Sequence, residues 1–209
     1  MVKLYNNQDY AEQLAHGGEL RMWSQSYYKT LEDARGDPAE GESHLLVPGL
    51  VPVVGVDTIS GEATEREPQQ GHFDFRGSFI NPTYLFCTSH PSADLNHLRS
   101  GPTAFLVRIL DPRRFAESLF QALVGSTHGD RKLGFLDGCP VRYDKGEVGS
   151  DFGHPETRLR IHFAQKSRFY EREHEYRFTA SLSGAAPGSP DYLTVKIASP
   201  DGLFDVERV

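Results

Sequence analysis

Residues 166–177 read KSRFYEREHEYR and run directly into a short apolar segment, FTASL. In an extended chain every second side chain shares one face, because side chains alternate along a strand. That face would carry Glu171, Glu173, Glu175 and Arg177. Carboxylates packed this closely repel one another wherever water is excluded, so they need cationic partners or a function that uses raised pKa values. The stretch is therefore a candidate functional site, and the competing interpretation is a solvated strand edge whose charges prevent aggregation.

The composition is that of a folded chain, and its length predicts a single domain over residues 1–209. The chain is 38% hydrophobic and includes 13 Phe and 9 Tyr, which is enough to build a core. Its net charge of −7 argues against binding of nucleic acid by bulk electrostatics, because that mode needs clustered Lys and Arg. Two cysteines without paired spacing, and the lack of a signal-like N-terminus or a long apolar run, predict a cytoplasmic protein with no membrane partner.

The pattern of apolar and turn-forming residues predicts helices mainly in the first two thirds and strands throughout. Helices are expected over 8–16, stopped by Gly17 and Gly18, in the segment SQSYYKTLEDA, and over 112–125 with Asp111 as the cap. Strands are expected at 20–24, 44–47, 51–56, 72–76, 83–88, 104–110, 141–143, 159–164, 177–182, 192–198 and 203–209. A surface loop is expected over 60–71. The sum predicts an α+β fold with a mixed, mainly antiparallel sheet core and a few flanking helices.

Three motifs follow one another along the chain: LRMWSQSYYKTLEDARGDPAEG, then YLFCTS, then a lysine with an aromatic residue ahead of EHEYRF. In this order they resemble the bacterial family catalogued as domain of unknown function number 2971. The resemblance spans most of the chain and implies no activity. The sequence differs from the family pattern at RGDP, where members more often have Asn-Asp-Pro.

The chain also resembles, more distantly, the ADP-ribosyltransferases of the arginine, serine, glutamate class. Those enzymes use an arginine on an early strand, a Ser-Thr-Ser segment at the start of a middle strand, and a late Glu-x-Glu. The resemblance assigns these places to Arg21, to Thr88 and Ser89, and to Glu173 and Glu175. The serine motif is reduced here to Cys-Thr-Ser and lies at the end of its strand. The resemblance implies an ADP-ribosyltransferase-like fold with NAD as the substrate.

The chemistry of such a site explains these residue types. Breaking the bond between nicotinamide and ribose builds positive charge on the sugar, which a nearby carboxylate stabilises, while a guanidinium binds the diphosphate bidentately. The resemblance gives the first role to Glu175 and the second to Arg21, with Glu173 orienting or deprotonating the acceptor. Aromatic rings for stacking nicotinamide or adenine would come from Trp23, Tyr27 and Tyr28.

Each assignment has a structural alternative. Arg21 can instead be an exposed strand residue facing Glu19, and the three aromatic side chains can form part of the core. Arg177 can serve only to neutralise Glu175. A thiol nucleophile is not expected, because Cys87 falls in an apolar strand where buried thiols are inert. No spacing of histidines or cysteines predicts a metal site, and the loop acids Asp37 and Glu40, which could hold a cation, are expected to be solvated.

Three functions follow from these observations. The first is an NAD-binding ADP-ribosyltransferase or NAD glycohydrolase-like enzyme, acting as a toxin or in defence against phage, on a macromolecular acceptor that the sequence does not identify. The second is a non-catalytic interaction or sensor domain that uses the acidic and aromatic late segment. The third is a magnesium-dependent nuclease built from Asp37, Glu40 and the late glutamates.

Overall fold

The computed structural model describes residues 1–30, 42–56, 63–78, 83–99, 104–126, 133–143, 164–182 and 191–209. Its strands are β1 (Val2–Tyr5), β2 (Glu19–Ser24), β3 (Glu42–Val56), β4 (Ala63–Ser78), β5 (Thr83–Ser89), β6 (Phe105–Ile109), β7 (Leu133–Pro140), β8 (Glu175–Leu182), β9 (Tyr192–Lys196) and β10 (Phe204–Arg208). Its helices are α1 (Gln8–Ala15), α2 (Gln25–Thr30), α3 (Leu95–Leu98), α4 (Pro112–Gly125) and the 3-10 helix η2 (Arg168–Glu173). The fold is α+β, as the sequence predicts.

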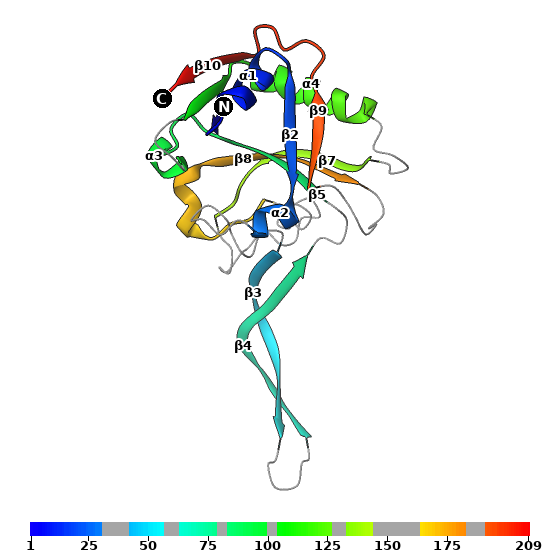
Figure 1. Cartoon of the computed structure of the whole chain (residues 1–209). Coiled ribbons are helices and arrows are strands. Elements are labelled where there is room, and N and C mark those ends of the chain that lie inside the picture. The colour runs from blue at the N-terminus through cyan, green and yellow to red at the C-terminus, as the bar shows by residue number, and fades with distance from the viewer. Residues whose placement is uncertain are drawn as a thin grey trace.

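Eight strands form one sheet, with β5 at its centre. Strand β8 pairs with one edge of β5 over its whole length, and β7 extends the sheet beyond β8. The other edge of β5 is shared: its start pairs with β2, which leads to β9, and its end pairs with β1, which leads to β6 and β10. Figure 1 shows β2 and β9 side by side on their own branch. Each ladder between these described strands is antiparallel, which confirms the predicted pairing.

The hydrophobic core lies on one face of this sheet, beneath α1 and α4. Strand side chains at alternate positions, such as Met22, Phe86 and Phe178, pack with Leu14 of α1 and Phe115 of α4. All five are buried. The opposite face of the same strands must therefore carry a different set of side chains, and it is there that the candidate site lies.

The two longer helices begin where the sequence predicts. Asn7 caps α1 by accepting a hydrogen bond from the N–H of Asp9 at 2.7 Å, and Asp111 caps α4 by accepting one from the N–H of Arg114 at 3.0 Å. Gly18, just beyond α1, has a φ of 66°, the left-handed geometry on which helices commonly end. No helix in the described part of the chain is long and apolar enough to cross a bilayer.

Strands β3 and β4 form a separate two-stranded ribbon that projects from the rest of the molecule (Figure 1). Two expectations for this region are wrong. The sequence predicts separate strands at 44–47 and 51–56, but β3 runs continuously through Pro48, which lies opposite His72. The expected loop over 60–71 is largely strand, because β4 begins at Ala63.

The prolines of this ribbon explain the first error, whereas the second arose because residues 60–71 are polar and lack periodicity. A proline cannot donate to the ladder, so the sequence argues against a strand there, yet prolines are accepted at sheet edges and bulges. Both strands of a two-stranded ribbon are edges. The register shifts between Val51 and Val53, so that Pro52 occupies the irregularity.

Candidate functional site

The three strands that carry the expected site residues are neighbours in the sheet, in the order β2, β5, β8. Ser89 and Glu175 are direct partners in the β5–β8 ladder, and Trp23 is the partner of Leu85 in the β2–β5 ladder. Residues directly opposite each other in an antiparallel ladder project to the same side, as do alternate residues of one strand. Arg21, Trp23, Ser89 and Glu175 therefore lie on one face of the sheet, opposite the face that packs on α4.

Glu175 lies at the centre of four buried charged side chains. Arg177 donates from Nε to Oε1 of Glu175 at 2.9 Å and from Nη2 to Oε2 at 3.3 Å. Lys166 Nζ lies 2.7 Å from Oε2 of Glu175 and 2.6 Å from Oε2 of Glu173. None of the four side chains is more than 7% exposed. Two cations thus balance two carboxylates in the interior, as burial of charge requires.

A change of backbone conformation brings the two glutamates together. The sequence predicts an extended chain throughout this stretch, but Arg168–Glu173 form the 3-10 helix η2. His174 then takes the left-handed conformation, with a φ of 41° and a ψ of 49°, before β8 begins at Glu175. The turn directs Glu173 to the same lysine as Glu175 and leaves Glu171 exposed to solvent.

The surroundings give the two glutamates different acidities. Burial alone would raise the pKa of Glu175, but the charges of Arg177 and Lys166 outweigh burial and hold that pKa well below its usual range. Burial also raises the pKa of Glu173, and there Lys166 offsets only part of the cost while the charge of Glu175 adds to it. Glu175 is therefore ionised at neutral pH, and Glu173 is the carboxylate that takes up a proton first as the pH falls.

A thiol and two phenols complete the surroundings of Glu175. Its backbone N–H donates to the hydroxyl of Tyr143 at 2.7 Å, its carboxylate accepts a hydrogen bond from Cys87, and Cys87 contacts Tyr28. Burial raises the pKa of Cys87 and that of Tyr143 to about 12, and raises the pKa of Tyr28 well above its usual value. The protonated, buried thiol is thus unsuited to act as a nucleophile, in line with the sequence.

The guanidinium of Arg21 lies between two tyrosine rings. Its central carbon is 4.5 Å from the ring centre of Tyr10 and 4.7 Å from that of Tyr192, and Nη1 donates to the hydroxyl of Tyr10 at 3.1 Å. Trp23 stacks on Tyr27 with ring centres 4.1 Å apart and lies 4.8 Å from Tyr192. The result is a continuous row of rings around one cation, along the β2–β9 branch of the sheet. We call these five side chains the aromatic row.

The structure brings some of the expected site residues together and separates others. Ser89 faces Glu175 across the ladder, but Thr88 projects to the other face and donates to the carbonyl of Tyr176 at 3.2 Å. Thr88 therefore cannot share a site with Glu175. Tyr28 meets Tyr27 edge to face at 6.1 Å and packs toward Cys87 rather than along the aromatic row.

Arg21 contacts tyrosines rather than acids. Within the residues that the structure describes, no ion pair joins Arg21 to Glu19, the residue it was expected to face, or to Glu173 or Glu175. Arg21 and Glu175 share a face of the sheet but hold separate positions on it.

The sequence interpretation missed Tyr143, which accepts a hydrogen bond from the backbone N–H of Glu175, and three further residues of this site. Lys166 was quoted only as the start of the late stretch, and its pairing with both glutamates depends on a turn that the alternating pattern of charges does not reveal. Tyr192 has a detectable signal, because the strand YLTVK alternates and places Tyr192 on the exposed face. Tyr10 lies on α1, and nothing local to that helix points to Arg21.

The residues expected for a magnesium-dependent nuclease do not form a described metal site. Asp37 and Glu40 lie outside the described residues. Over the described ranges, no three His, Cys, Asp or Glu side chains are grouped so as to hold a metal ion. The late glutamates are bound instead by Lys166 and Arg177.

Comparison of the chain with protein-family models, with curated protein sequences and with solved structures gave no match. The function is therefore argued from the residues and their geometry.

Proposed function

We propose that the chain is an NAD-binding enzyme that transfers ADP-ribose to a macromolecular acceptor or releases it to water. The observation that carries this proposal is the order of β2, β5 and β8, which puts Arg21, Ser89 and Glu175 on one face of the sheet. These residues come from three distant parts of the chain, and they are the types that the resemblance to ADP-ribosyltransferases requires, in the same order.

Glu175 suits the role of the carboxylate that stabilises the developing positive charge of the ribose. That role requires the ionised form, and Arg177, the partner on the same strand, lowers the pKa of Glu175 and so favours that form. Arg177 and Tyr143 also fix its position. A charge held in place before the reaction needs no reorganisation when the transition state forms.

Access to Glu175 requires one partner to withdraw, because its side chain is 6% exposed. Arg177 belongs to β8 itself, whereas Lys166 precedes η2 and lies outside the sheet strands. We therefore assign the withdrawal to Lys166, with the ribose hydroxyls taking its place. Glu173, the other carboxylate that Lys166 binds, keeps the proposed role of orienting the acceptor.

The aromatic row suits the two remaining parts of NAD. The stacked rings of Trp23 and Tyr27 provide a surface for nicotinamide or adenine. The guanidinium of Arg21 is restrained by its contacts with the rings of Tyr10 and Tyr192, so it loses little conformational freedom when it binds a diphosphate bidentately.

The test is incubation of the purified chain with NAD, with and without cell extract. We expect release of nicotinamide, an ADP-ribose adduct when an acceptor is present, and an increased melting temperature with NAD. Arg21→Gln should lower turnover by about 10- to 100-fold, the worth of hydrogen bonds to a charged group. Arg108→Gln is the matched control, because Arg108 is also a partly exposed arginine of the same sheet, paired with Glu207 far along the chain.

Three negative results together would refute the enzyme: no nicotinamide, no adduct and no thermal shift with the wild-type protein. Equal turnover by Arg21→Gln and Arg108→Gln would refute the role of Arg21. The free thiols Cys87 and Cys139 suit the cytoplasm. If the chain acts there as a toxin or a phage-defence effector, induced expression of the wild type should lower cellular NAD, and expression of Arg21→Gln should not.

A second function, partner recognition, is favoured by the exposed side chains of η2. The interpretation from sequence placed recognition on Glu173 and Glu175, but both are buried. Phe169 of the same stretch is 67% exposed and lies between Arg168 and Tyr170, with its ring centre 5.2 Å from that of Tyr170. Large aromatic side chains exposed in this way often anchor a protein partner.

Substitution of Phe169 distinguishes recognition from catalysis. If η2 is the recognition surface, Phe169→Ala should abolish capture of a bound protein and leave NAD turnover unchanged. Val124→Ala, at an apolar side chain that is 70% exposed on α4, is the control and should retain capture. Equal capture by wild type and Phe169→Ala would dismiss this function.

A further inference from the structure

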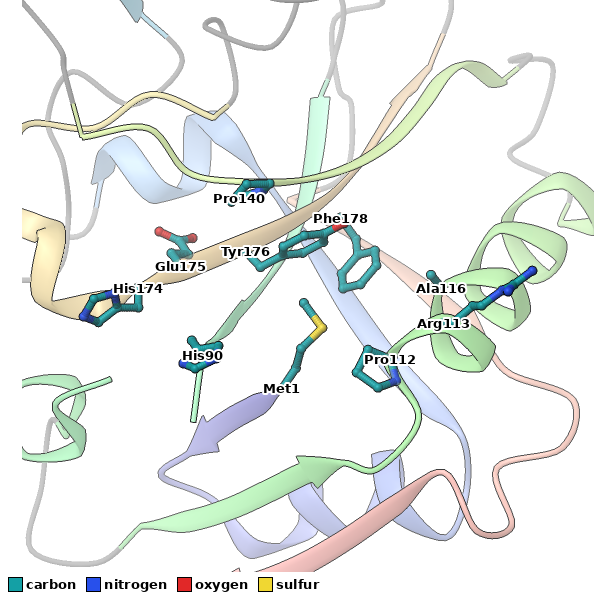
Figure 2. Close-up of a pocket in the computed structure, with 10 residues that line it drawn as sticks. All are labelled: Met1, His90, Pro112, Arg113, Ala116, Pro140, His174, Glu175, Tyr176 and Phe178. Carbon is teal, nitrogen blue, oxygen red and sulfur yellow. The ribbon is translucent and has the colours of Figure 1, made fainter. Parts of the chain in front are cut away.

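A pocket of about 450 Å³ lies on the opposite face of the sheet from the candidate NAD site. It is enclosed by β8, the end of β7, the start of α4 and the first residue of the chain (Figure 2). Small-molecule sites usually occupy about 300–1,000 Å³, so this volume suits a compact ligand. The proposed NAD chemistry gives this pocket no role.

The walls of the pocket are apolar. They are formed by the side chains of Met1, Pro112, Ala116, Pro140, Tyr176 and Phe178. The rings of Tyr176 and Phe178 lie 5.1 Å apart and form an aromatic wall on β8, and Figure 2 shows the side chain of Met1 projecting toward them. An aromatic or aliphatic body would be dehydrated favourably in this space.

One end of the pocket carries two exposed histidines, His90 and His174 (Figure 2). The N–H of His90 donates to the carbonyl of His174 at 2.9 Å, which fixes the two residues relative to each other. His90 Nδ1 lies 2.7 Å from the hydroxyl of Ser92, and this bond orients its ring. The two histidines thus place polar groups at one end of an otherwise apolar space.

The charges of the lining residues do not oppose an anion at the histidine end. Among the described lining residues the acid is Glu175, whose charge is already balanced by Arg177 and Lys166. Arg113 lies on α4 at the other end, where its Nε donates to Glu117 at 3.0 Å in an exposed pair. No unbalanced negative charge from these lining residues therefore opposes an acidic ligand group.

We propose that this pocket binds a small aromatic carboxylate. Its ring system lies against Tyr176, Phe178 and Met1, and its carboxylate accepts hydrogen bonds from His90 and His174. Glu175 borders both sites, whereas Arg21 and Ser89 are not among the lining residues of the pocket. The proposal does not depend on the NAD chemistry, because it is tested by binding alone.

The experiment is isothermal titration calorimetry of the full chain with naphthalene-2-carboxylate and, separately, with its uncharged carboxamide. We expect saturable binding of the carboxylate and about tenfold weaker binding of the carboxamide, since hydrogen bonds to a charged acceptor are the stronger ones. Ala116→Trp should fill the pocket and abolish binding. Val124→Trp, on the exposed side of the same helix, is the matched control and should bind as the wild type does.

Two further variants test the orientation of the ligand without filling the pocket. His174→Gly removes one imidazole and suits the left-handed backbone at that position, so the fold should survive and affinity for the carboxylate should fall about tenfold. Arg113→Gln, at the opposite end, should change affinity by less than about twofold, because an exposed ion pair contributes little. Circular dichroism verifies the fold of each variant.

Several results would overturn the proposal. The absence of saturable binding by the wild type, or wild-type binding by a folded Ala116→Trp, would exclude the pocket. Equal affinity for the carboxylate and the carboxamide, or an unchanged affinity in His174→Gly, would exclude an anion site at the histidines. If Ala116→Trp fails to fold, the comparison of His174→Gly with Arg113→Gln decides the matter.

Discussion

At the residue scale, Glu173 and Glu175 differ in pKa because they share one cation, Lys166, and only Glu175 has a second. Glu175 also has Arg177, so its charged form is stabilised, whereas Glu173 competes for one cation in the interior. The sequence shows both glutamates and even the arginine, but their difference depends on a lysine whose position the local pattern does not encode. The pairing of Arg177 with Glu175, which the sequence does suggest, is confirmed.

The different acidities predict opposite effects of pH on stability. The lowered pKa of Glu175 stabilises the fold above the unfolded pKa, and this contribution is lost as the pH falls. The raised pKa of Glu173 means that the fold prefers its protonated form, so its contribution declines as the pH rises above about 4.5, its ordinary value. Glu173→Gln should therefore gain stability relative to wild type between pH 4.5 and 7, as measured by urea unfolding across that range. A difference independent of pH would contradict the raised pKa.

At the element scale, the parts predicted best are those with their own start and stop signals. Helix α4 has a capping aspartate, a proline in its first turn and buried side chains at Phe115, Leu119 and Leu123, so it could be identified locally. Strands β1 and β7 were not predicted, because β1 has four residues and β7 contains two glycines and a proline. Helix η2 was mistaken for strand, since alternation of charge and rings fits a strand as well as this short helix.

The cap of α4 gives a direct prediction for this element. Asp111→Ala leaves the N–H of Arg114 without its side-chain acceptor and should lower the free energy of unfolding by about 1 kcal/mol. Asp111→Asn keeps an acceptor of the same shape and should remain within a few tenths of wild type. Chemical denaturation of the three proteins measures both values. An equal loss in the two variants would show that the charge of Asp111 matters rather than its cap.

At the scale of the whole molecule, what could not be read from the sequence is which strands are neighbours. The fold class and most strands follow from local patterns, but strand pairing joins distant segments through contacts that no local pattern specifies. Thus Ser89 and Glu175 were both expected site residues, yet their direct pairing depends on the β5–β8 register. The same register excludes Thr88, and the β2–β9 pairing brings Tyr192 to Arg21.

The buried charges connect the site to the stability of the whole fold. Arg177 is 1% exposed, so Arg177→Met should leave two buried carboxylates with one lysine and cost about 3–5 kcal/mol. The double variant Arg177→Met, Glu175→Leu restores one cation for one carboxylate and should be more stable than Arg177→Met alone. Unfolding free energies of both single variants and the double variant complete a thermodynamic cycle. Losses that simply add would show that the two charges act independently.

Strand β8 has charged groups on one side and rings on the other, and this alternation makes its length intolerant of small insertions and deletions. Removing one residue at the His174 turn would exchange the two sides, turning Arg177 toward the apolar core and Phe178 toward the ions. Substitutions affect one side chain at a time, but a shift in the register of the strand would disrupt the ion cluster and the apolar wall together. Variation in chain length should therefore be confined to segments outside β8.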